Sequence, residues 1–323
     1  MRAALYRRTG PAADVLEIAE VDRPVPGPGQ VRVRVATSGV NPTDWKTRSG
    51  ASGAAPDGWQ IPNQDGAGTI DAVGDGVDEA RVGQRVWVWF AATGQRWGTA
   101  AEWTVVPSPR AVDLPDDVDF DLGASLGIPA VTASHCLFAD GPLDGATVLV
   151  AGGAGAVGHF AIELARHGGA RVATTVSNED KATLARQAGA DLVVNYRAAD
   201  AAEQIRAWAP HVDRIVEVAL GANLDLDLAV SRPGTTVVSY ANEPEDPTLP
   251  VRRCMVANLS LDFVLLYNVA GAGLDAAVKG VGEALAAGAL SPLPLQRFGL
   301  ERIADAHDAV EQGALGKVLV DVA

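Results

Sequence analysis

The sequence is poor in cysteine, with only Cys136 and Cys254 among 323 residues. Two thiols cannot build a disulfide framework or a four-thiolate zinc site. The sequence also lacks an apolar run near the ~18–20 residues of a membrane-spanning helix. Arginines interrupt the first ten residues before the apolar part of a signal peptide could develop. These absences predict a soluble, cytoplasmic protein with no membrane partner.

Positive charge is scarce as well. Lys and Arg number 26 against 40 Asp and Glu, which gives a formal net charge of −14. An acidic chain is repelled by phosphate backbones and anionic lipids, so nucleic acid and membrane surfaces are poor partners. A local basic pocket for one small phosphate is still compatible with this balance. Hydrophobic residues at 48% and charged residues at 20% are typical of a folded chain, and the length suits two domains.

The first part of the chain, 1–120, has the pattern of a β domain. Residues 31–35 alternate strictly between valine and arginine, as a half-buried strand does. Residues 68–74 and 85–89 are further strand candidates, while the proline-rich stretch 24–29 can be neither helix nor central strand. Short strands separated by glycine, proline and aspartate favour a small barrel-like domain.

From 121 to 266 the pattern changes to alternating strands and helices. We expect strands at 147–151, 171–176, 191–194, 213–219, 235–240 and 260–266. Asn178 is a candidate N-cap with Gly189 as the stop of the same helix, and Asp200 with Glu203 matches a capping-box variant. The alternation predicts an α/β domain with a doubly wound parallel sheet.

After residue 266 the pattern changes again, with helices expected near 274–287 and 301–312 and a last strand at 317–322. That strand is too far from the α/β block to belong to its repeating units. We therefore assign 1–120 together with 267–323 to one domain and 121–266 to an inserted dinucleotide-binding domain.

The strongest chemical signal is the glycine loop after the strand at 147–151. Gly153, Gly155 and Gly158 match G-x-G-x-x-G, with a buried-type strand before them and an amphipathic helix after them. In this context the first glycine permits a tight turn, the second lets the backbone approach a pyrophosphate, and the third brings helix and strand together. Backbone N–H groups and the helix dipole then hold the anion. The alternative is an ordinary glycine-rich turn.

The residues after the second strand of this unit bear on the choice between NAD and NADP. An NAD site places an acid there for the ribose 2′-hydroxyl. Here the strand ends with Ser177 and Asn178, and Lys181 follows within one turn. Small donors and a lysine suit a 2′-phosphate. Glu179 and Asp180 argue against it, although first-turn acids also stabilise a helix by themselves. We predict NADPH.

These features together resemble one enzyme family. The residues that carry the resemblance lie at 38–44, 63–70 and 132–133, in the glycine loop, at 188–191, at 195–197 and at 316–318. The chain resembles the medium-chain dehydrogenase/reductase superfamily, most closely its zinc-independent quinone oxidoreductase (zeta-crystallin-like) branch. The resemblance implies a GroES-like β-rich domain built from both chain ends plus a Rossmann domain.

The resemblance also implies cofactor contacts. It places Asn41 and Thr132 by the nicotinamide, between the domains, and Ala154, Gly155, Ala156 and Val157 at the pyrophosphate. It places Ser177, Lys181 and Tyr196 around the adenosine and its 2′-phosphate, and Ala219, Ser239, Tyr240, Ala241 and Asn242 near the nicotinamide ribose. Phe263, Val264 and Leu265 would contact the carboxamide, and Lys317 would approach from the tail. Alternatively, Tyr196 packs at a strand end, and Phe263 lies in the core or a subunit interface.

Zinc-dependent relatives carry Cys where this chain has Asn41, and His-Glu where it has Gln64 and Asp65. Amides are poor zinc ligands, and the five histidines form no pair with ligand spacing. We therefore predict no zinc. Without a Lewis acid, hydride delivery to an electron-poor acceptor, such as a quinone or an α,β-unsaturated carbonyl, is the chemistry that fits. Asp44 and Asp65 are interpreted as braces of the β domain, with a catalytic role as the alternative.

Two further predictions concern the acceptor and the assembly. Trp45, Trp59 and Trp97 lie in loop-like sequence and are candidates for the wall of a flat pocket. The apolar run 259–267 could extend a sheet across a two-fold axis, which predicts a homodimer.

The alternative functions are an enoyl-thioester reductase, an alcohol dehydrogenase and a non-catalytic NADPH-binding protein. An enoyl-thioester reductase would require basic residues for a carrier phosphate. Arg7, Arg8, Lys46 and Arg48 could supply that charge, although the sequence does not group them convincingly.

Overall fold

The computed structural model describes residues 1–53, 55–243 and 245–322. Its internal contacts divide the chain into two compact units, Met1–Ile128 with Pro292–Ala323 and Pro129–Ser291. The boundaries expected from the sequence, 120/121 and 266/267, lie earlier along the chain. Helix α3 (Phe120–Phe138) runs through the first of them, and α9 (Gly271–Ala286) contacts α4 (Ala156–His167) of the second unit.

The first unit is built on one mixed sheet with the strand order β14-β15-β3-β4-β5-β7, and β6 pairs with β3. Its strands are β3 (Gln30–Val40), β4 (Asp65–Val73), β5 (Arg85–Val88), β6 (Trp103–Pro107), β7 (Ala111–Asp113), β14 (Leu295–Gly299) and β15 (Lys317–Asp321). A separate antiparallel pair joins β1 (Arg2–Leu5) and β2 (Glu17–Glu20). Because β15 pairs antiparallel with β3, the predicted return of the tail to the N-terminal part of the chain is confirmed.

Alternating burial explains why β3 forms where it does. Val31, Val33 and Val35 are buried, whereas Arg32 and Arg34 are not, so one face of the strand carries the apolar residues. The short helical elements of this unit are α1 (Ala12–Val15), α2 (Pro42–Ser49) and α10 (Ile303–Glu311), with 3₁₀ turns at Glu79–Arg81, Ser108–Arg110 and Leu300–Arg302.

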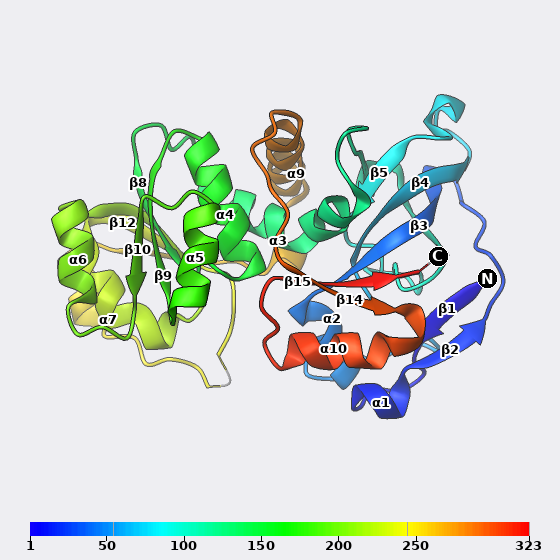
Figure 1. The fold of residues 1–323 in the computed structure, drawn as a ribbon, viewed down its shortest axis with the longest axis horizontal. Helices are drawn as coiled ribbons and strands as arrows, with labels where there is room; N and C mark the ends of the chain where they lie inside the picture. Colours follow the sequence, from blue (N-terminus) through cyan, green and yellow to red (C-terminus); the bar gives the residue numbers. More distant parts are fainter. Residues whose placement is uncertain (54, 244, 323) are drawn as a thin grey trace. The chain divides into compact units, whose positions relative to one another are not determined.

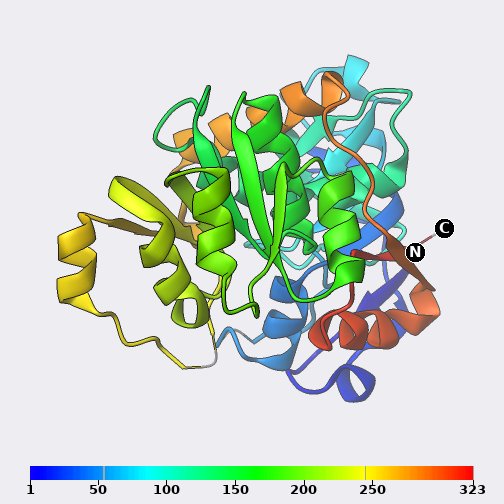
Figure 2. The ribbon, with the colours of Figure 1, turned by 60° about the vertical axis from the view of Figure 1, so that its left-hand side comes forward.

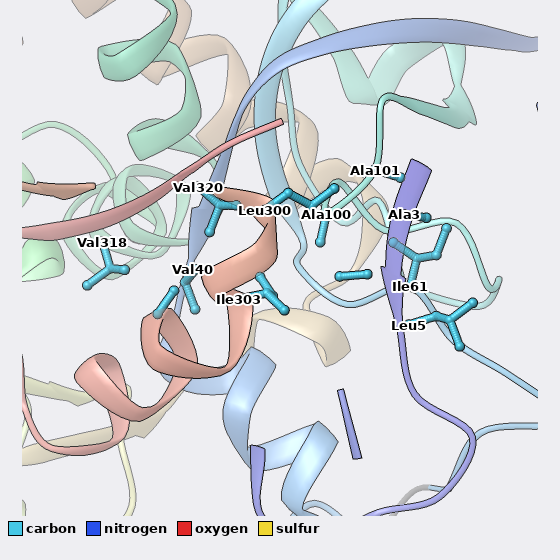
Figure 3. Close-up of a cluster of buried hydrophobic side chains, with 12 residues drawn as sticks. Ala3, Leu5, Val40, Ile61, Ala100, Ala101, Leu300, Ile303, Val318 and Val320 are labelled. Atoms are coloured by element: carbon cyan, nitrogen blue, oxygen red, sulfur yellow. The ribbon is translucent and has the colours of Figure 1, made fainter. Parts of the chain in front are cut away.

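One hydrophobic cluster joins the two ends of the chain within this unit. Figure 3 shows Ala3 and Leu5 of β1 near side chains of the C-terminal segment, among them Leu300 and Ile303. Val318 and Val320 of β15 and Val40 of β3 belong to the same cluster, and each is at most 2% exposed. Burying these side chains holds β15, and therefore Lys317 at its start, firmly against β3.

The second unit contains a six-stranded sheet, order β10-β9-β8-β11-β12-β13, in which every pairing is parallel. The strands are β8 (Thr147–Ala151), β9 (Arg171–Val176), β10 (Leu192–Asn195), β11 (Val212–Glu217), β12 (Ser231–Ser239) and β13 (Ser260–Phe263). Strands and helices alternate along this part of the chain (Figure 1). The predicted doubly wound parallel sheet is therefore confirmed.

The helices of this unit are α4, α5 (Glu179–Gln187), α6 (Ala201–Trp208), α7 (Leu220–Val230), α8 (Val251–Ala257) and α9, with the second half of α3 and a 3₁₀ turn at Leu266–Asn268. Figure 2 shows strands of the sheet side by side with helices packed over them. β8 and β11 are neighbours although β9 and β10 separate them in sequence. The connection reverses direction there, and in such sheets ligands bind beyond the carboxyl ends of the two strands.

Local structure departs from the sequence prediction in a few places. Asp200 starts α6 without a side-chain cap bond, because its carboxylate accepts from Gln204 Nε2 instead, so the predicted capping box with Glu203 is wrong. The last strand of the parallel sheet ends at Phe263, earlier than predicted. Among the described residues, no helix combines the length and the apolarity needed to cross a membrane.

Candidate functional site

The glycine loop begins with a tight turn at the end of β8. Gly152 has a φ of 70°, a left-handed conformation that suits glycine, whereas Gly153 does not have a positive φ. The turn glycine is therefore Gly152, which corrects the sequence-based assignment of the turn to Gly153. Gly153 instead allows the loop to pack closely against β9, since a Cβ there would lie 2.1 Å from Thr174 Oγ1.

The other two glycines differ in what surrounds them. A Cβ on Gly158 would lie 2.4 Å from the carbonyl oxygen of Gly152, so this glycine allows the close approach of helix and loop, as predicted. A Cβ on Gly155 would lie 3.4 Å from that same oxygen, an ordinary contact. Gly155 therefore adjoins space that the protein itself does not fill, as a backbone position facing a ligand does.

The N-terminus of α4 presents free backbone donors at this loop. Gly155 is the N-cap and makes no side-chain cap bond. Within the described chain, the first-turn N–H groups of Ala156 and Val157 donate to no acceptor. Unpaired N–H groups at a helix N-terminus, with the positive end of the helix dipole, favour an anion. The geometry fits a pyrophosphate at the predicted position.

The edge formed by β9 and β10 brings together the residues predicted around the adenosine. β9 and β10 pair in register, Val176 with Asn195, so Ser177 and Tyr196 follow neighbouring strand ends. The backbone N–H of Lys181 donates to Asn178 Oδ1 at 3.0 Å, which confirms the predicted N-cap. The ring of Tyr196 is 42% exposed, and the Arg197 guanidinium lies 5.6 Å from its centroid.

The later strands place the remaining predicted positions of this unit along the same carboxyl edge. Ser239 at the end of β12 is in register with Phe263 of β13, and Val264 N–H donates to the carbonyl of Ser239 at 2.8 Å. Ala219 follows β11; Tyr240, Ala241 and Asn242 follow β12; and Leu265 follows β13. Thr132 lies in α3 and is 5% exposed. The sheet thus aligns these positions by its register.

Glu217, at the end of β11, is a buried polar residue on this edge of the sheet that the sequence analysis did not single out. It is fully buried, and its Oε1 accepts hydrogen bonds from the N–H of Ala219 and from Asn223 Nδ2. Burial raises the pKa of the Glu217 carboxyl, and its Oε2 has no partner among the described residues. The sequence did contain a signal for this residue, because an acidic side chain at the end of an apolar strand is unusual.

The first unit holds a buried polar cluster around the start of α2. Asn41 is the N-cap of α2, and the backbone N–H of Asn41 donates to Asp44 Oδ2 at 2.7 Å as part of a capping box. Asp44 Oδ1 accepts from the N–H of Gln64 at 3.1 Å. Asp44 therefore ties α2 to the segment before β4, which is the bonding that its interpretation as a brace predicts.

Asp65 and Lys317 complete this cluster. Asn41 Nδ2 donates to Asp65 Oδ2 at 2.6 Å, and Lys317 Nζ donates to Asn41 Oδ1 at 2.7 Å while lying 3.7 Å from Asp65 Oδ2. Asp65 also accepts from the N–H of Ile128 at 2.9 Å. Lys317 and Asp65 are 2% and 0% exposed. Lys317, predicted to approach the cofactor, is thus bonded within the cluster.

The cluster holds two carboxyls against one ammonium, and desolvation affects all three. Burial, and then the nearby Asp65, raise the pKa of Asp44 to about 8. Burial also raises the pKa of Asp65 and lowers that of Lys317, although each of these two groups opposes the shift of the other. With the Asp44 carboxyl mostly neutral at pH 7, one carboxyl of the cluster, that of Asp65, faces the Lys317 ammonium, whose Nζ lies 3.7 Å from Asp65 Oδ2.

A pH-dependent stability follows from Asp44. Because its pKa is raised from 3.8 to about 8 on folding, its contribution to the free energy of unfolding is complete below about pH 4 and is lost as the pH rises toward 8. Asp44→Asn removes this titration, at a pH-independent cost from the lost hydrogen bonds. The stability of the variant relative to the wild type should therefore improve with pH, by up to about 1.4 kcal/mol per pH unit. Urea unfolding from pH 5 to 8 measures this, and a constant difference would contradict it.

A second buried chain supports the segment before β4. His307 Nε2 donates to Asn63 Oδ1 at 3.0 Å, and Asn63 Nδ2 donates to Ser38 Oγ at 2.9 Å. Burial, and then Arg48, lower the pKa of His307 to about 3, so the ring stays neutral. Asn63 has a φ of 74°, and these bonds hold that left-handed backbone in place.

A pocket of about 160 Å³ opens on this segment. Its lining combines apolar groups with hydroxyl, amide and carboxyl groups, from Tyr6, Asp44, Thr47, Ala55, Pro56, Gln60, Pro62, Asn63, Gln64 and Ala92. None of the three predicted pocket tryptophans is in this lining. Trp59 and Trp97 instead form an edge-to-face pair with centroids 5.1 Å apart and pack against the cluster of Figure 3.

Family models of dehydrogenase domains match the sequence of both units. The model described as "Alcohol dehydrogenase GroES-like domain" matches residues 27–116, and "Zinc-binding dehydrogenase" matches residues 156–283. The first lies in the β-rich unit and the second covers the glycine loop from Ala156 onward. The chain is an enzyme of the oxidoreductase class with a GroES-like domain and a Rossmann-like domain.

Individual relatives show which oxidoreductases the chain is similar to. The chain is 31% identical to a quinone oxidoreductase of Mus musculus, over 95% of this chain and 94% of the relative, and 30% identical to a 2-haloacrylate reductase of a Burkholderia species, over 95% and 94%. It belongs to the medium-chain dehydrogenase/reductase superfamily, in its quinone oxidoreductase (zeta-crystallin-like) branch.

Solved structures agree on the fold. A mycobacterial protein in complex with NADPH superposes with a TM-score of 0.84 at 27% identity, with 99% of each chain covered. An NAD-dependent alcohol dehydrogenase superposes with a TM-score of 0.88 at 26% identity, with 100% of each chain covered. Both nicotinamide cofactors therefore occur on this fold.

Proposed function

We propose that this enzyme is an NADPH-dependent reductase that delivers hydride, without zinc, to a quinone or an α,β-unsaturated carbonyl compound. The observation that carries the proposal is the open glycine cradle: a Cβ on Gly155 would make only an ordinary contact, and the N–H groups of Ala156 and Val157 donate to no acceptor among the described residues. The pyrophosphate of a dinucleotide satisfies those donors.

The preference for NADP rests on charge at the ends of β9 and β10. Ser177 takes the place of the acid that an NAD site uses for the ribose, and Lys181 lies in the first turn of α5. Glu179, which would repel a 2′-phosphate, pairs with Arg186 at 2.6 Å. The NADPH complex of the mycobacterial relative supports the same choice.

The donor set of the first unit does not fit a zinc ion. At the positions where zinc-dependent relatives carry ligands stand Asn41, Gln64 and Asp65, and the Lys317 ammonium is hydrogen-bonded to Asn41 among them. Two amides beside a buried cation disfavour a second positive charge. In the described part of the chain, no three His, Cys, Asp or Glu side chains cluster as metal ligands.

The acceptor class follows from this lack of a Lewis acid. Alcohol oxidation needs a group that stabilises an alkoxide, whereas a conjugated acceptor is already electron-poor. The relatives named quinone oxidoreductase and 2-haloacrylate reductase point to the same kind of acceptor. NADPH supplies the hydride; the protein holds the nucleotide at the glycine loop and the acceptor in the pocket beside Asp44 and Gln64.

An enoyl-thioester reductase remains the alternative, and the basic residues weigh against it. The buried Arg48 donates from Nη1 to the carbonyl oxygen of Gly10 at 2.7 Å and from Nη2 to Glu311 Oε2 at 3.0 Å. Arg7 pairs with Glu17 at 3.1 Å. These two arginines therefore give little support to a carrier-phosphate site.

The proposal is tested by following NADPH oxidation with quinones, enones, 2-haloacrylate and enoyl thioesters, each repeated with NADH. We expect turnover with at least one conjugated acceptor, a preference for NADPH, and no loss after treatment with a chelator. Turnover restricted to simple alcohols or abolished by chelation would contradict it.

We also propose a homodimer. Strand β13 lies at the edge of the parallel sheet, and Phe263 and Leu265 are 67% and 60% exposed beside it. An exposed apolar edge strand is a template for pairing with a second copy. Light scattering should give twice the chain mass for the wild type and a smaller mass for Phe263→Glu. A monomeric wild type would contradict the proposal.

A further inference from the structure

The pocket of the first unit contains one amide, that of Gln64, whose NH₂ group has no acceptor among the described residues. Gln64 is 9% exposed and is one of the pocket's lining residues. Its backbone is fixed at both polar atoms, since its N–H donates to Asp44 Oδ1 at 3.1 Å and its carbonyl accepts from Ala91 N–H at 3.0 Å. The residue therefore has little freedom to move relative to the pocket.

The side-chain amide of Gln64 is also oriented. Its Oε1 accepts from the backbone N–H of Ala92 at 3.1 Å and from Thr93 Oγ1 at 3.0 Å. A backbone N–H can only donate, so the atom facing Ala92 must be the oxygen, and the NH₂ group is on the opposite side. Among the described residues, Gln64 Nε2 donates to no acceptor.

A neighbouring glutamine shows what a purely structural amide looks like in the same wall. Gln60 Nε2 donates to the carbonyls of Ile61 at 2.9 Å and Gln95 at 3.1 Å. Its donors are fully used by the backbone. Gln64 has the opposite arrangement: its Oε1 is bonded to the protein, and its two donor hydrogens have no acceptor among the described residues, although the residue lines the pocket.

We propose that Gln64 is a catalytic residue whose Nε2 hydrogen-bonds the carbonyl oxygen of the acceptor and stabilises the negative charge that hydride transfer places on it. The inference rests on the proposed function and adds the group that receives this charge. It also specifies the acceptor as one with a carbonyl oxygen conjugated to the carbon that takes the hydride.

The chemistry balances with an enone as acceptor. Hydride from NADPH forms a C–H bond at the β-carbon, and the π electrons of the C=C bond move so that the carbonyl oxygen becomes an enolate oxygen. Gln64 Nε2 donates to that oxygen without transferring its own proton. A proton from solvent then bonds to the α-carbon, giving the saturated ketone and NADP⁺. A fixed donor aimed at developing charge lowers the barrier because it needs no reorganisation.

The surroundings of Gln64 favour this role. The titratable residues in the pocket lining are Asp44 and Tyr6. Burial raises the pKa of Tyr6 to about 12, and that of Asp44 is raised to about 8, so both side chains are mostly neutral at pH 7. No ionised carboxylate of the lining then opposes the charge on the acceptor oxygen.

Two variants of Gln64 and one matched control test the proposal by kinetics. Gln64→Met keeps the length of the side chain but removes the donor, and we expect kcat/KM for an enone to fall about 10²-fold. Gln64→Glu keeps an acceptor for Ala92 and places negative charge at the donor position, so its loss should be larger. Gln84→Met, in the same unit and outside the pocket lining, should retain wild-type kcat/KM. All variants should bind NADPH as the wild type does.

Thr93→Val tests the positioning part separately. It removes one of the two anchors of Oε1 while leaving the amide in place. We expect an intermediate loss in kcat with the enone and a smaller effect on NADPH affinity. If both Gln64 variants fold, bind NADPH and retain wild-type kcat/KM, the proposal is overturned while the proposed function stands.

A measurement without turnover separates the two failures. The side-chain NH₂ signal of Gln64 is identified in the ¹⁵N spectrum of the full chain by its disappearance in Gln64→Met. Cyclohexanone, a saturated ketone, is then added as a probe in the presence of NADP⁺. A shift of this signal supports the proposal even if no acceptor is reduced, and an unmoved signal while other pocket residues shift overturns it.

Discussion

Lys317→Met should lower the free energy of unfolding by about 3–5 kcal/mol, because it leaves a carboxylate buried without its cation. Lys317 is 2% exposed, and its Nζ bonds Asn41 Oδ1 at 2.7 Å beside the fully buried Asp65. Methionine has a similar length and fills the same space, so the loss reports on charge rather than on volume. Urea unfolding at pH 7 measures it.

The double variant Lys317→Met/Asp65→Asn provides the control. Removing both charges should recover a large part of the stability that the single lysine variant loses, since a neutral amide at 65 can still accept from the Ile128 N–H. If the losses of unfolding free energy in Lys317→Met and Asp65→Asn simply add in the double variant, the two side chains do not interact. The account of the cluster as one cation balanced by one anion would then be wrong.

The second large effect concerns the glycine cradle. Gly155→Ala should weaken NADPH binding on the order of 10²-fold, about 2.7 kcal/mol, while the fold is kept. Gly155 has φ −78° and ψ 162°, which alanine adopts without strain, and its Cβ would make only an ordinary contact with the protein. The methyl group would instead occupy the space in which the backbone approaches the pyrophosphate. Fluorescence titration with NADPH measures the affinity.

Gly158→Ala is the matched comparison for this prediction. Its Cβ would lie 2.4 Å from the Gly152 carbonyl oxygen, so helix and loop must separate and the unfolding temperature should fall. The two alanine variants thus separate a ligand-facing glycine from a packing glycine. Wild-type NADPH affinity in Gly155→Ala would mean that the cofactor does not lie against this loop.

The architecture could be predicted because its signals are local. Alternating valines defined β3, and short apolar runs ending in glycine or a polar residue defined the strands of the parallel sheet. β8 and β9 match their predicted bounds, and the N-cap at Asn178 forms as expected. Helix α3 was missed, because Pro129 and two glycines within it interrupt the helical pattern.

The polar clusters could not be predicted because they depend on contacts distant in sequence. Lys317 and Asn41 are 276 positions apart, and His307 and Asn63 are 244 apart. Gln64 was seen only as a poor metal ligand, since nothing local shows that Ala92 and Thr93 orient its amide. The tight turn at Gly152 was assigned one residue late, because Gly152 and Gly153 are adjacent and the G-x-G-x-x-G pattern begins only at Gly153.

The most direct test of the central claim is the fate of the hydride after metal has been removed. The enzyme is treated with a strong chelator and given an enone with NADPH that carries deuterium at the transferable C4 position. We predict undiminished turnover and a saturated ketone with one deuterium at its β-carbon. Loss of turnover with the metal, or a product without deuterium, would contradict the account.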